Sequence, residues 1–413
     1  MVKIKQNFVT DSITDISREI REELARLEPE KIISPGQSVA IATGSRGVYK
    51  IDEILATLVN ELKKIDAKPF IVPAMGSHGG ATSEGQKEIL QHYGITEDRL
   101  GVPIKASMEV TQIGETSDGI PVLIGKSASQ ADHIVIVNRV KPHTDFEGDI
   151  ESGLMKMMVI GLGKQKAADL YHNEFMRLGH PRVIVSVARK IMGKCPIAFG
   201  LALVENQKDE TQIIKIIPAQ HIEETEKKLL ILAKELLPRI PLDPIDILIV
   251  DQMGKEISGT GMDQTVIART VVPYHKVPAR PRIGRIIVRD LTQESGGNII
   301  GIANADFTTK RLVDKIDRKI SYMNAITSSC PEAIRIPPYF DSDREAIEAA
   351  YHTIRRTTPQ NIRMVHIKNT LFLEEMYISE ALISEAKKVK HISIIGSPEL
   401  MTFDENGNIP NRF

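Results

Sequence analysis

The sequence predicts an α/β protein with two α/β domains and an active site in the cleft between them. Short apolar runs alternate with segments whose apolar residues recur at helical spacing, which is typical of repeated strand–helix units. The chain has 413 residues, more than one hydrophobic core usually serves. A proline-rich segment, residues 236–244, interrupts the alternation. We therefore expect domains over residues 1–240 and 245–413, with the last residues packing back on the first domain.

Composition and charge limit the classes of function. The chain is 42% hydrophobic and 26% charged, with a formal net charge of −1 and no long block of one sign. This balance argues against nucleic acid and anionic membranes as partners. Cys195 and Cys330 are too few for a disulfide framework or a thiolate metal site. No apolar run has the length of a signal peptide or bilayer span. We expect a cytoplasmic enzyme with a small-molecule partner, in a possible homo-oligomer.

The first strand–turn–helix unit spans residues 38–65. Ser38–Ala42 is a run of small and β-branched residues that predicts a strand, and residues 52–65 have apolar positions at helical spacing. Ser45 and Arg46 lie in the polar turn between them. Main-chain N–H groups and a helix N-terminus can bind an anion there, and the arginine can pair with phosphate or carboxylate. A structural N-cap by Ser45 is the competing interpretation.

The second unit repeats this arrangement. Pro69–Pro73 predicts a strand and Ser83–Tyr93 a helix, with Gly76 and His78 in the glycine-rich turn between them. We expect this turn to meet the ends of the neighbouring strands, because the carboxyl ends of parallel strands share one edge of a sheet. A surface histidine is the alternative.

The most informative stretch, residues 138–172, begins where the apolar run Ile134–Val137 stops at polar residues. It contains His143, Lys156 and His172 among several glycines. A lysine can form a covalent link to a cofactor, and an imidazole can bind a metal or act as an acid or base. Taken alone, each of these residues is more often solvated or packed than functional.

The other elements follow the same alternation. In the N-terminal domain we expect antiparallel strands over residues 103–114 and 120–127, helices over 165–175, 181–192 and 222–237, and strands over 197–204 and 212–218. In the C-terminal domain we expect strands over residues 245–250, 285–288, 298–302, 363–367 and 391–395, and helices over 308–324, 344–357 and 373–389.

The glycine-containing loop 251–264 follows the first strand of the C-terminal domain. Because this loop leaves the carboxyl end of a strand, Lys255, Glu256, Asp263 and Gln264 are expected to face the site across the interdomain cleft.

Pro142-His143, the Ser-Gly-x-x-Lys pattern ending at Lys156, and His172 resemble the nickel-dependent lactate racemase family. The Gly-Ser-His of residues 76–78 and the Ser45-Arg46 turn support this resemblance. Members of this family are racemases and epimerases of 2-hydroxy acids that use a nickel-pincer nucleotide.

This resemblance implies an isomerase that binds nickel in a pyridinium-3,5-bisthiocarboxylic acid mononucleotide. Lys156 would be the tether for this cofactor, and His172 would be the protein ligand to nickel. His78 and His143 would be the acid/base groups on opposite faces of the substrate. The remaining implied contacts are those of Ser45 and Gly76 with the cofactor, and of Arg46, Lys255 and Gln264 with the substrate.

The chemistry explains these residue types. Removing the α-proton of a 2-hydroxy acid produces a dianion, whereas moving the hydrogen as hydride to a cofactor avoids that charge. Two histidines with pKa values near neutrality can exchange the roles of base and acid at the hydroxyl. One imidazole leaves nickel open to soft donors from the cofactor.

The chain departs from the expected pattern between His143 and Lys156, where it carries four acids: Asp145, Glu147, Asp149 and Glu151. Carboxylates accept hydrogen bonds from several hydroxyls, so a sugar acid would suit the site better than lactate. Acids that face water on a loop are an equally good interpretation.

Two alternatives come from other classes. A phosphoryl-transfer enzyme would use the Gly-Leu-Gly-Lys-Gln-Lys turn at residues 161–166, although this turn lacks the Lys-Ser/Thr pair of a phosphate loop. A non-catalytic nickel or nucleotide carrier would need Lys156 and His172 but not both His78 and His143.

Overall fold

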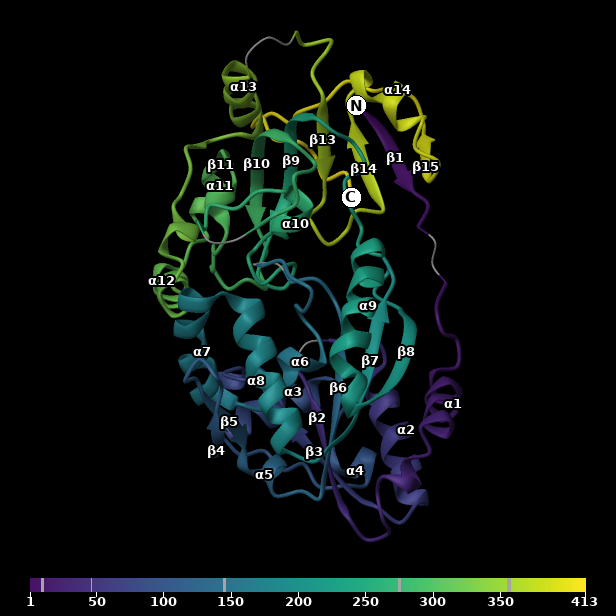
Figure 1. The fold of residues 1–413 in the computed structure, drawn as a ribbon. Helices are drawn as coiled ribbons and strands as arrows, with labels where there is room; N and C mark the ends of the chain where they lie inside the picture. Colours follow the sequence, from purple (N-terminus) through teal and green to yellow (C-terminus); the bar gives the residue numbers. More distant parts are fainter. Residues whose placement is uncertain (9–10, 46, 144–145, 274–275, 355–357) are drawn as a thin grey trace. The chain divides into compact units, whose positions relative to one another are not determined.

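The computed structural model describes residues 1–8, 11–45, 47–143, 146–273, 276–354 and 358–413, which form two compact α/β units (Figure 1). The predicted fold class is confirmed. Among the described residues, the N-terminal unit comprises 11–143 and 147–237, and the C-terminal unit comprises 1–8, Phe146 and 238–413. The division after Leu237 lies in the proline-rich segment. No helix of the described chain is both long and apolar enough to cross a membrane.

The N-terminal unit is built on a five-stranded sheet in the order β3-β2-β6-β7-β8. Its strands are β2 (Ser38–Thr43), β3 (Lys68–Pro73), β6 (His133–Arg139), β7 (Ile197–Glu205) and β8 (Thr211–Pro218), and a separate hairpin consists of β4 (Val110–Glu115) and β5 (Pro121–Gly125). Only β8 is antiparallel to its neighbour in the five-stranded sheet.

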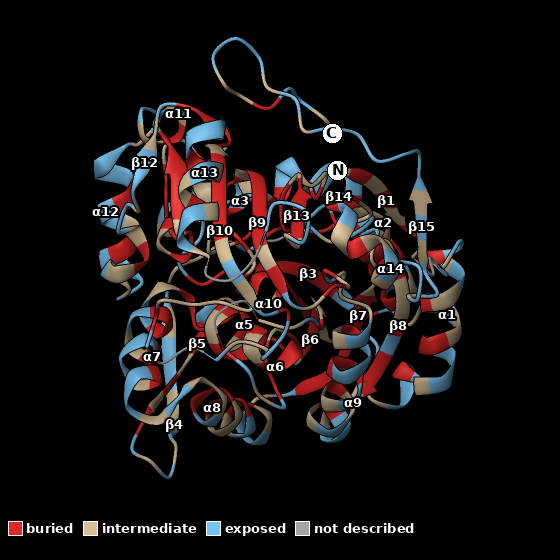
Figure 2. Ribbon diagram, turned by 90° about the horizontal axis from the view of Figure 1, so that it is seen from above, coloured by how far each residue is buried: buried red, intermediate tan, exposed pale blue. Residues whose placement is uncertain are grey.

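Helices pack on both faces of this sheet. They are α1 (Ile16–Leu27), α2 (Ile51–Lys64), α3 (Ser83–His92), α4 (Glu97–Leu100), α5 (Lys126–Ser129), α6 (Leu154–Lys156), α7 (Lys164–Leu178), α8 (His180–Lys194) and α9 (Ile222–Glu235), with a π-helical segment at Met157–Gly161 between α6 and α7. The strands are largely buried, whereas the helices expose their outer faces (Figure 2).

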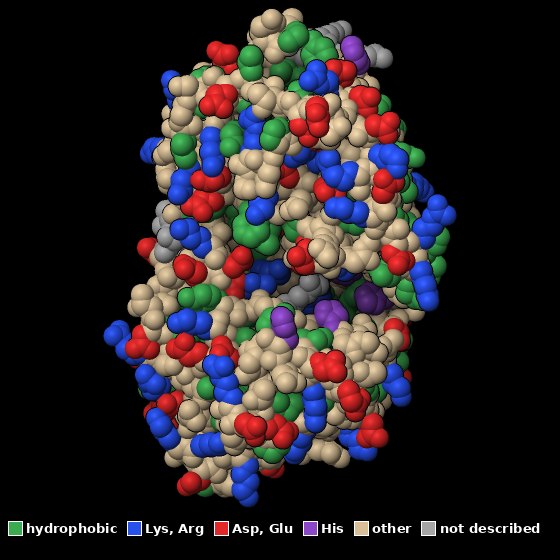
Figure 3. Space-filling view, turned by 180° about the vertical axis from the view of Figure 1, so that it is seen from behind, with side chains coloured by type: hydrophobic (Ala, Val, Ile, Leu, Met, Phe, Trp, Pro, Cys, Tyr) green, Lys and Arg blue, Asp and Glu red, His purple; other side chains and the backbone are tan. Residues whose placement is uncertain are grey.

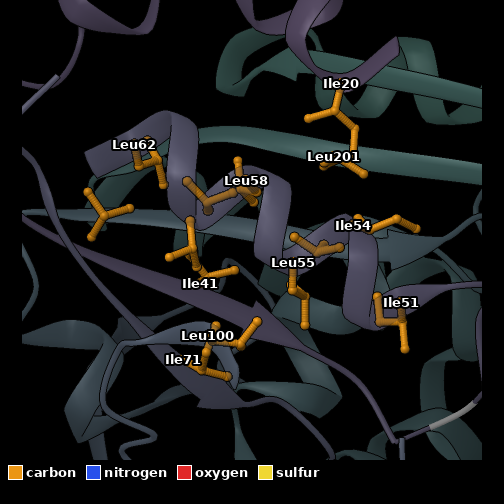
Figure 4. Close-up of a cluster of buried hydrophobic side chains, with 14 of the residues drawn as sticks. Ile20, Ile41, Ile51, Ile54, Leu55, Leu58, Leu62, Ile71, Leu100 and Leu201 are labelled. Carbon is orange, nitrogen blue, oxygen red and sulfur yellow. The ribbon is translucent and has the colours of Figure 1, made fainter. Parts of the chain in front are cut away.

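The core of the N-terminal unit follows from the period of two along each strand. Alternate residues of the central strands, such as Ile41 and Leu201, contribute to the cluster on the α1/α2 face. Leu55, Leu58 and Leu62 of α2 recur at helical spacing in the same cluster (Figure 4). Burying each such side chain stabilises the fold by about 1.5–3 kcal/mol. This packing fixes the strands whose ends carry the candidate site.

The C-terminal unit contains an eight-stranded sheet in the order β12-β11-β10-β9-β13-β14-β1-β15. Its strands are β1 (Val2–Gln6), β9 (Ile245–Met253), β10 (Ile283–Leu291), β11 (Phe307–Thr309), β12 (Tyr339–Phe340), β13 (Met364–Ile367), β14 (Glu375–Ile378) and β15 (Ile392–Ile395), and its helices are α10 (Gln264–Ile267), α11 (Lys310–Val313), α12 (Arg318–Thr327), α13 (Asp343–Thr353) and α14 (Ile383–Ala386). Strands β9 to β13 pair in parallel, whereas β14, β1 and β15 are antiparallel to their neighbours.

Both ends of the chain differ from the sequence prediction. The first residues form β1, which pairs with β14 and β15 in the C-terminal unit. The alternation of buried Val2 and Ile4 with Lys3 and Lys5 was the signal for this strand. The last residues pack on the C-terminal unit rather than on the first domain, because the main chain of Ile409 hydrogen-bonds to Arg289 and Asp343.

Three elements of the C-terminal domain were also predicted wrongly. The helix expected over 373–389 begins instead as β14, since pairing with β13 and β1 outweighs a helical apolar pattern. The helix expected over 308–324 is divided into the end of β11, α11 and α12, with Thr309 and Asp317 as separate N-caps. The segment 298–302 is a turn rather than a strand.

Candidate active site

Three neighbouring parallel strands bring the predicted site segments of the N-terminal unit to one edge of the sheet. Thr43, the last residue of β2, pairs in register with Pro73 of β3 and Val137 of β6. Ser45, His78 and His143 therefore follow strands that end at the same level, as predicted. Because β2 lies between β3 and β6, the two histidines come from strands on either side of it. Histidine side chains gather on one face in the space-filling view (Figure 3).

Ser45 contacts His78 directly. Its hydroxyl lies within hydrogen-bonding distance of His78 Nδ1, so the end of β2 orients the imidazole that follows β3. His78 is exposed and Ser45 is half-buried. A cavity of about 550 Å³ borders Ser45 and one side of α3 along its length, and Glu84, Glu88 and His92 contribute to its polar wall.

The turn that carries His78 packs closely on the helical segment after Lys156. Gly76 has a φ of 58°, and its N–H donates to the carbonyl of Gly161 over 3.2 Å. A Cβ at Gly76 would lie 3.2 Å from Ile160 Cγ2. A side chain at Gly161 would meet the carbonyl oxygen of Ala74 at 2.7 Å. Both positions therefore require glycine, which keeps these two segments in contact.

Lys164 is a buried cation that holds the same turn in place. Its Nζ donates to the carbonyl of Pro73 over 2.5 Å and to Gln86 Oε1 over 3.2 Å. Gln86 Nε2 in turn donates to the carbonyls of Gly76 and His78 over 3.1 and 3.4 Å. Burial lowers the pKa of Lys164 to about 8.

This network accounts for the Gly-Leu-Gly-Lys-Gln-Lys turn. The lysine that a phosphate site would need is only 1% exposed and binds protein carbonyls. Leu162 is fully buried, and its carbonyl accepts the N–H of Gly125 over 2.7 Å. The turn is therefore packed into the interior of the N-terminal unit. Its lysine binds protein groups, so this motif no longer supports the phosphoryl-transfer alternative.

His143 is held through its main chain. Its N–H donates to Glu151 Oε2 over 2.6 Å, and Glu151 Oε1 accepts the N–H of Gly148 over 3.0 Å. The Nζ of Lys234 on α9 lies 2.6 Å from Glu151 Oε1. Glu151 is 2% exposed, so this acid organises the loop rather than facing water. Glu147 and Asp149 are exposed, and Asp145 lies outside the described residues.

Lys156 ends helix α6, and both sides of its segment are anchored. Asn138 Nδ2, at the end of β6, donates to the carbonyl of Gly153 over 2.8 Å. The carboxyl of Glu226 on α9 accepts the N–H of Met155 over 3.0 Å. The segment is thus fixed between a strand end and a helix, and Lys156 itself is half-buried.

His172 lies on the exposed side of α7. The preceding Tyr171 is fully buried, and its hydroxyl donates to the carbonyl of Pro121 and accepts the N–H of Leu123, each over 3.1 Å. Because Tyr171 fixes the helix from the inside, its neighbour points outward. The ring of His172 packs edge-on against Phe175, with centroids 5.7 Å apart.

The residues predicted to contact the substrate do not all lie in the N-terminal unit. Lys255 and Gln264 belong to the C-terminal unit. Lys255 Nζ donates to the carbonyl of Gly259 over 2.7 Å and to Asn324 Oδ1 over 3.1 Å. Gln264 is 1% exposed, and its Oε1 has no hydrogen-bond partner within the described chain. Arg46 lies outside the described residues.

The donor set suits a cofactor that brings its own metal ligands. Within the described ranges, no group of three or more His, Cys, Asp or Glu side chains could hold a metal ion. A nucleotide whose own donors surround nickel would need only one imidazole and a lysine, and His172 and Lys156 fit that requirement.

The sequence analysis did not predict the supporting roles of four buried polar residues. Glu151, Glu226, Lys164 and Gln86 are all at most 2% exposed and bind main-chain groups at or near the predicted site residues. The only signal in the sequence was polar residues at otherwise apolar positions, such as Glu226 near Leu229 and Leu230 in α9.

The arrangement, with two histidines, a lysine and glycine-lined turns after neighbouring strands, is typical of ligand sites at the carboxyl edge of a parallel sheet. Residues 3–182 match the lactate racemase N-terminal domain family, which confirms the predicted resemblance. No protein with a curated function matches the sequence.

Two solved structures share the fold. The lactate racemase apoprotein from Thermoanaerobacterium thermosaccharolyticum is 15% identical, with a TM-score of 0.53, over 85% of this chain and 91% of that chain. A protein from Thermotoga maritima is also 15% identical, with a TM-score of 0.51, over 88% of this chain and 98% of that chain.

Proposed function

We propose that the protein is a racemase or epimerase that inverts a hydroxyl-bearing carbon of a 2-hydroxy carboxylic acid, with a sugar acid as the preferred substrate class. The observation that carries this proposal is the placement of His78 and His143 after strands β3 and β6, on either side of β2, within the residues that match the lactate racemase N-terminal domain family. Inversion requires proton transfer at the substrate oxygen on both faces of the reacting carbon. His78 and His143 would supply one proton-transfer group for each face.

The two histidines act on the hydroxyl oxygen. One imidazole accepts the hydroxyl proton as the alcohol becomes a ketone, and the other donates a proton when the opposite alcohol forms. Ser45, at Nδ1 of His78, orients that ring. Glu151, which accepts the main-chain N–H of His143, fixes the start of the loop that follows β6.

A nickel-pincer nucleotide, when bound, supplies hydride chemistry at the reacting carbon. Lys156 would tether this nucleotide, and His172 would be the protein ligand to nickel. The close packing at Gly76 and Gly161 supports this assignment, because it fixes the helical segment that follows Lys156 against the turn that carries His78.

The substrate class rests on the polar surroundings of the site. Asp149 is exposed on the loop that follows His143, and its carboxylate suits a substrate with several hydroxyls better than one with a methyl group. Glu151 no longer supports a sugar acid, because its carboxylate binds main-chain N–H groups and Lys234.

The test is to produce the protein with and without the enzymes that make the nucleotide. Intact mass and nickel content would report loading, and chiral analysis would follow lactate and a panel of aldonic and uronic acids. We expect nickel, an added mass on Lys156 and inversion of at least one sugar acid only in the loaded protein. A loaded protein that inverts no 2-hydroxy acid would favour the carrier alternative, and a protein that never loads would contradict the cofactor assignment.

A further inference from the structure

A buried carboxyl on α9 reaches the start of the helix that carries Lys156. Glu226 is 0% exposed, and its Oε2 accepts the N–H of Met155 over 3.0 Å. The main chain of Leu154 also hydrogen-bonds to this carboxyl. These are N–H groups of the first helical turn, which have no partner within the helix itself. Glu226 therefore caps α6 from a distant part of the sequence.

The packing around Gly153 shows how closely this contact is fitted. A Cβ at Gly153 would lie 2.3 Å from Glu226 Oε1, so no larger residue fits while the carboxyl is in place. The carbonyl of Gly153 accepts Asn138 Nδ2 from the other side over 2.8 Å. The three residues before Lys156 are thus held between the end of β6 and helix α9.

Stability alone gives no reason for a carboxyl at this position. Oε1 of Glu226 is buried and has no hydrogen-bond partner within the described residues. Burial raises the pKa of Glu226 to about 7, against the opposing effect of the Met155 and Leu154 N–H groups. An apolar side chain of similar volume would avoid this desolvation cost. The carboxyl instead fixes the position of the main chain at Leu154 and Met155.

The same helix also reaches the segment that begins at His143. Lys234, eight residues after Glu226, lies 2.6 Å from Glu151 Oε1, and Glu151 binds the main chain of His143. Residues eight apart lie on the same side of an α-helix. One face of α9 therefore contacts both the Lys156 segment and the His143 loop.

We propose that Glu226 is a positioning residue that sets the place of Lys156 for attachment of the cofactor, acting through the cap on α6. This inference rests on the proposed function, since it concerns the lysine assigned there as the tether. It assigns a role to a residue 70 positions from Lys156 in the sequence.

The test begins with the protein free of cofactor. Hydrogen exchange of the amides of residues 154–157, and the rate at which Lys156 reacts with an acylating reagent, report the order of this segment without any activity. Glu226→Leu removes the cap, whereas Glu226→Gln keeps an acceptor oxygen. Leu230→Ala, a cavity variant on the same helix, is the control for general destabilisation, since Leu230 is 2% exposed.

We expect Glu226→Leu to accelerate exchange at residues 154–157 and acylation of Lys156, while the fraction of Lys156 that carries the cofactor at limiting nucleotide falls about tenfold, equivalent to ~1.4 kcal/mol. Glu226→Gln should restore most of the loading. Leu230→Ala should lower the melting temperature without moving either local measurement. If Glu226→Leu does not fold, Glu226→Asp, which is one methylene shorter, takes its place.

Unchanged exchange and acylation in Glu226→Leu would overturn the proposal, as would equal changes in Leu230→Ala. A wild-type protein that never acquires the adduct would instead contradict the proposed function. The measurements on the cofactor-free protein would still decide whether Glu226 orders the segment.

Discussion

The main-chain N–H of His143 donates to the carboxylate of Glu151 over 2.6 Å, and this carboxylate also binds Lys234 of α9. A residue expected to contact substrate or water therefore fixes the loop that carries a proposed acid/base group. Because the contact is to the main chain, the place of His143 depends on Glu151 whatever the histidine side chain does.

We predict that Glu151→Ala lowers turnover by about 10-fold or more and destabilises the fold by roughly 3 kcal/mol, because it leaves two N–H groups of the loop without their acceptor. Initial rates of inversion and urea unfolding would measure the two effects. Glu147→Ala, an exposed acid of the same loop, should change neither. Full activity in Glu151→Ala would show that the loop is fixed by other contacts.

The second prediction separates the histidines by role. His172→Ala should lose nickel, whereas His143→Ala should retain nickel and lose about 10²–10⁴-fold in turnover, the usual contribution of a general acid or base. The reason is position, since His172 lies on α7 beyond Lys156 and His143 follows a strand as His78 does. Metal analysis and rates on the same preparations would test this. Equal loss of metal in both variants would refute the division of roles.

The third prediction concerns the hydrogen on the reacting carbon. Substrate with deuterium at that carbon should give inverted product that keeps most of the label, because hydrogen moved as hydride does not exchange with water. A mechanism in which His78 and His143 remove and return the carbon-bound proton would instead introduce solvent hydrogen. Mass spectrometry of the first-formed product would distinguish them. Extensive solvent label would overturn hydride transfer and leave the racemase or epimerase class standing.

The fourth prediction is a pH dependence of stability caused by Glu226. Its pKa is raised from 4.5 to about 7 in the folded protein, so the folded state holds the proton over a range in which the unfolded state has released it. This contribution to stability is complete below pH 4.5 and is lost as the pH rises to about 7. Relative to Glu226→Gln, the wild-type free energy of unfolding should therefore fall by about 3 kcal/mol over this range and then level off. Urea unfolding at several pH values would measure the difference, and parallel curves would contradict the buried carboxyl.

The fifth prediction concerns the buried charges of the C-terminal unit. Arg289 bonds to Asp251 and Asp343 and donates to the carbonyl of Ile409 over 2.5 Å. Arg289→Met should cost roughly 3–5 kcal/mol, because it removes the buried cation that Asp251 and Asp343 share and leaves them only His366 and Arg311 as basic partners within the described chain. Arg285→Met, on the same strand but at a half-buried position, should cost less than about 1 kcal/mol. Equal unfolding midpoints for the two variants would show that the acids find other partners.

The sequence by itself determined the fold class and the edge of the sheet at which the N-terminal site lies. Ile134–Val137 and the run from Ser38 are apolar because central parallel strands are buried on both faces, and the polar residues after them mark the strand ends. The Pro142-His143 pair, Lys156 and His172 were recognisable because their spacing along the chain is itself the motif.

Only the tertiary structure shows which groups the buried charged side chains bind. Glu151 and Lys234, Glu226 and Met155, and Lys164 and Pro73 are each at least 70 residues apart, and no periodicity of the chain relates the members of a pair. The tertiary structure also makes β14 a strand, because its main chain pairs with β13 and with β1 from the far end of the sequence. A local pattern predicts most strands and helix faces, but the structure of a segment such as β14 and the partner of a buried polar group depend on which elements the packing of the sheet brings together.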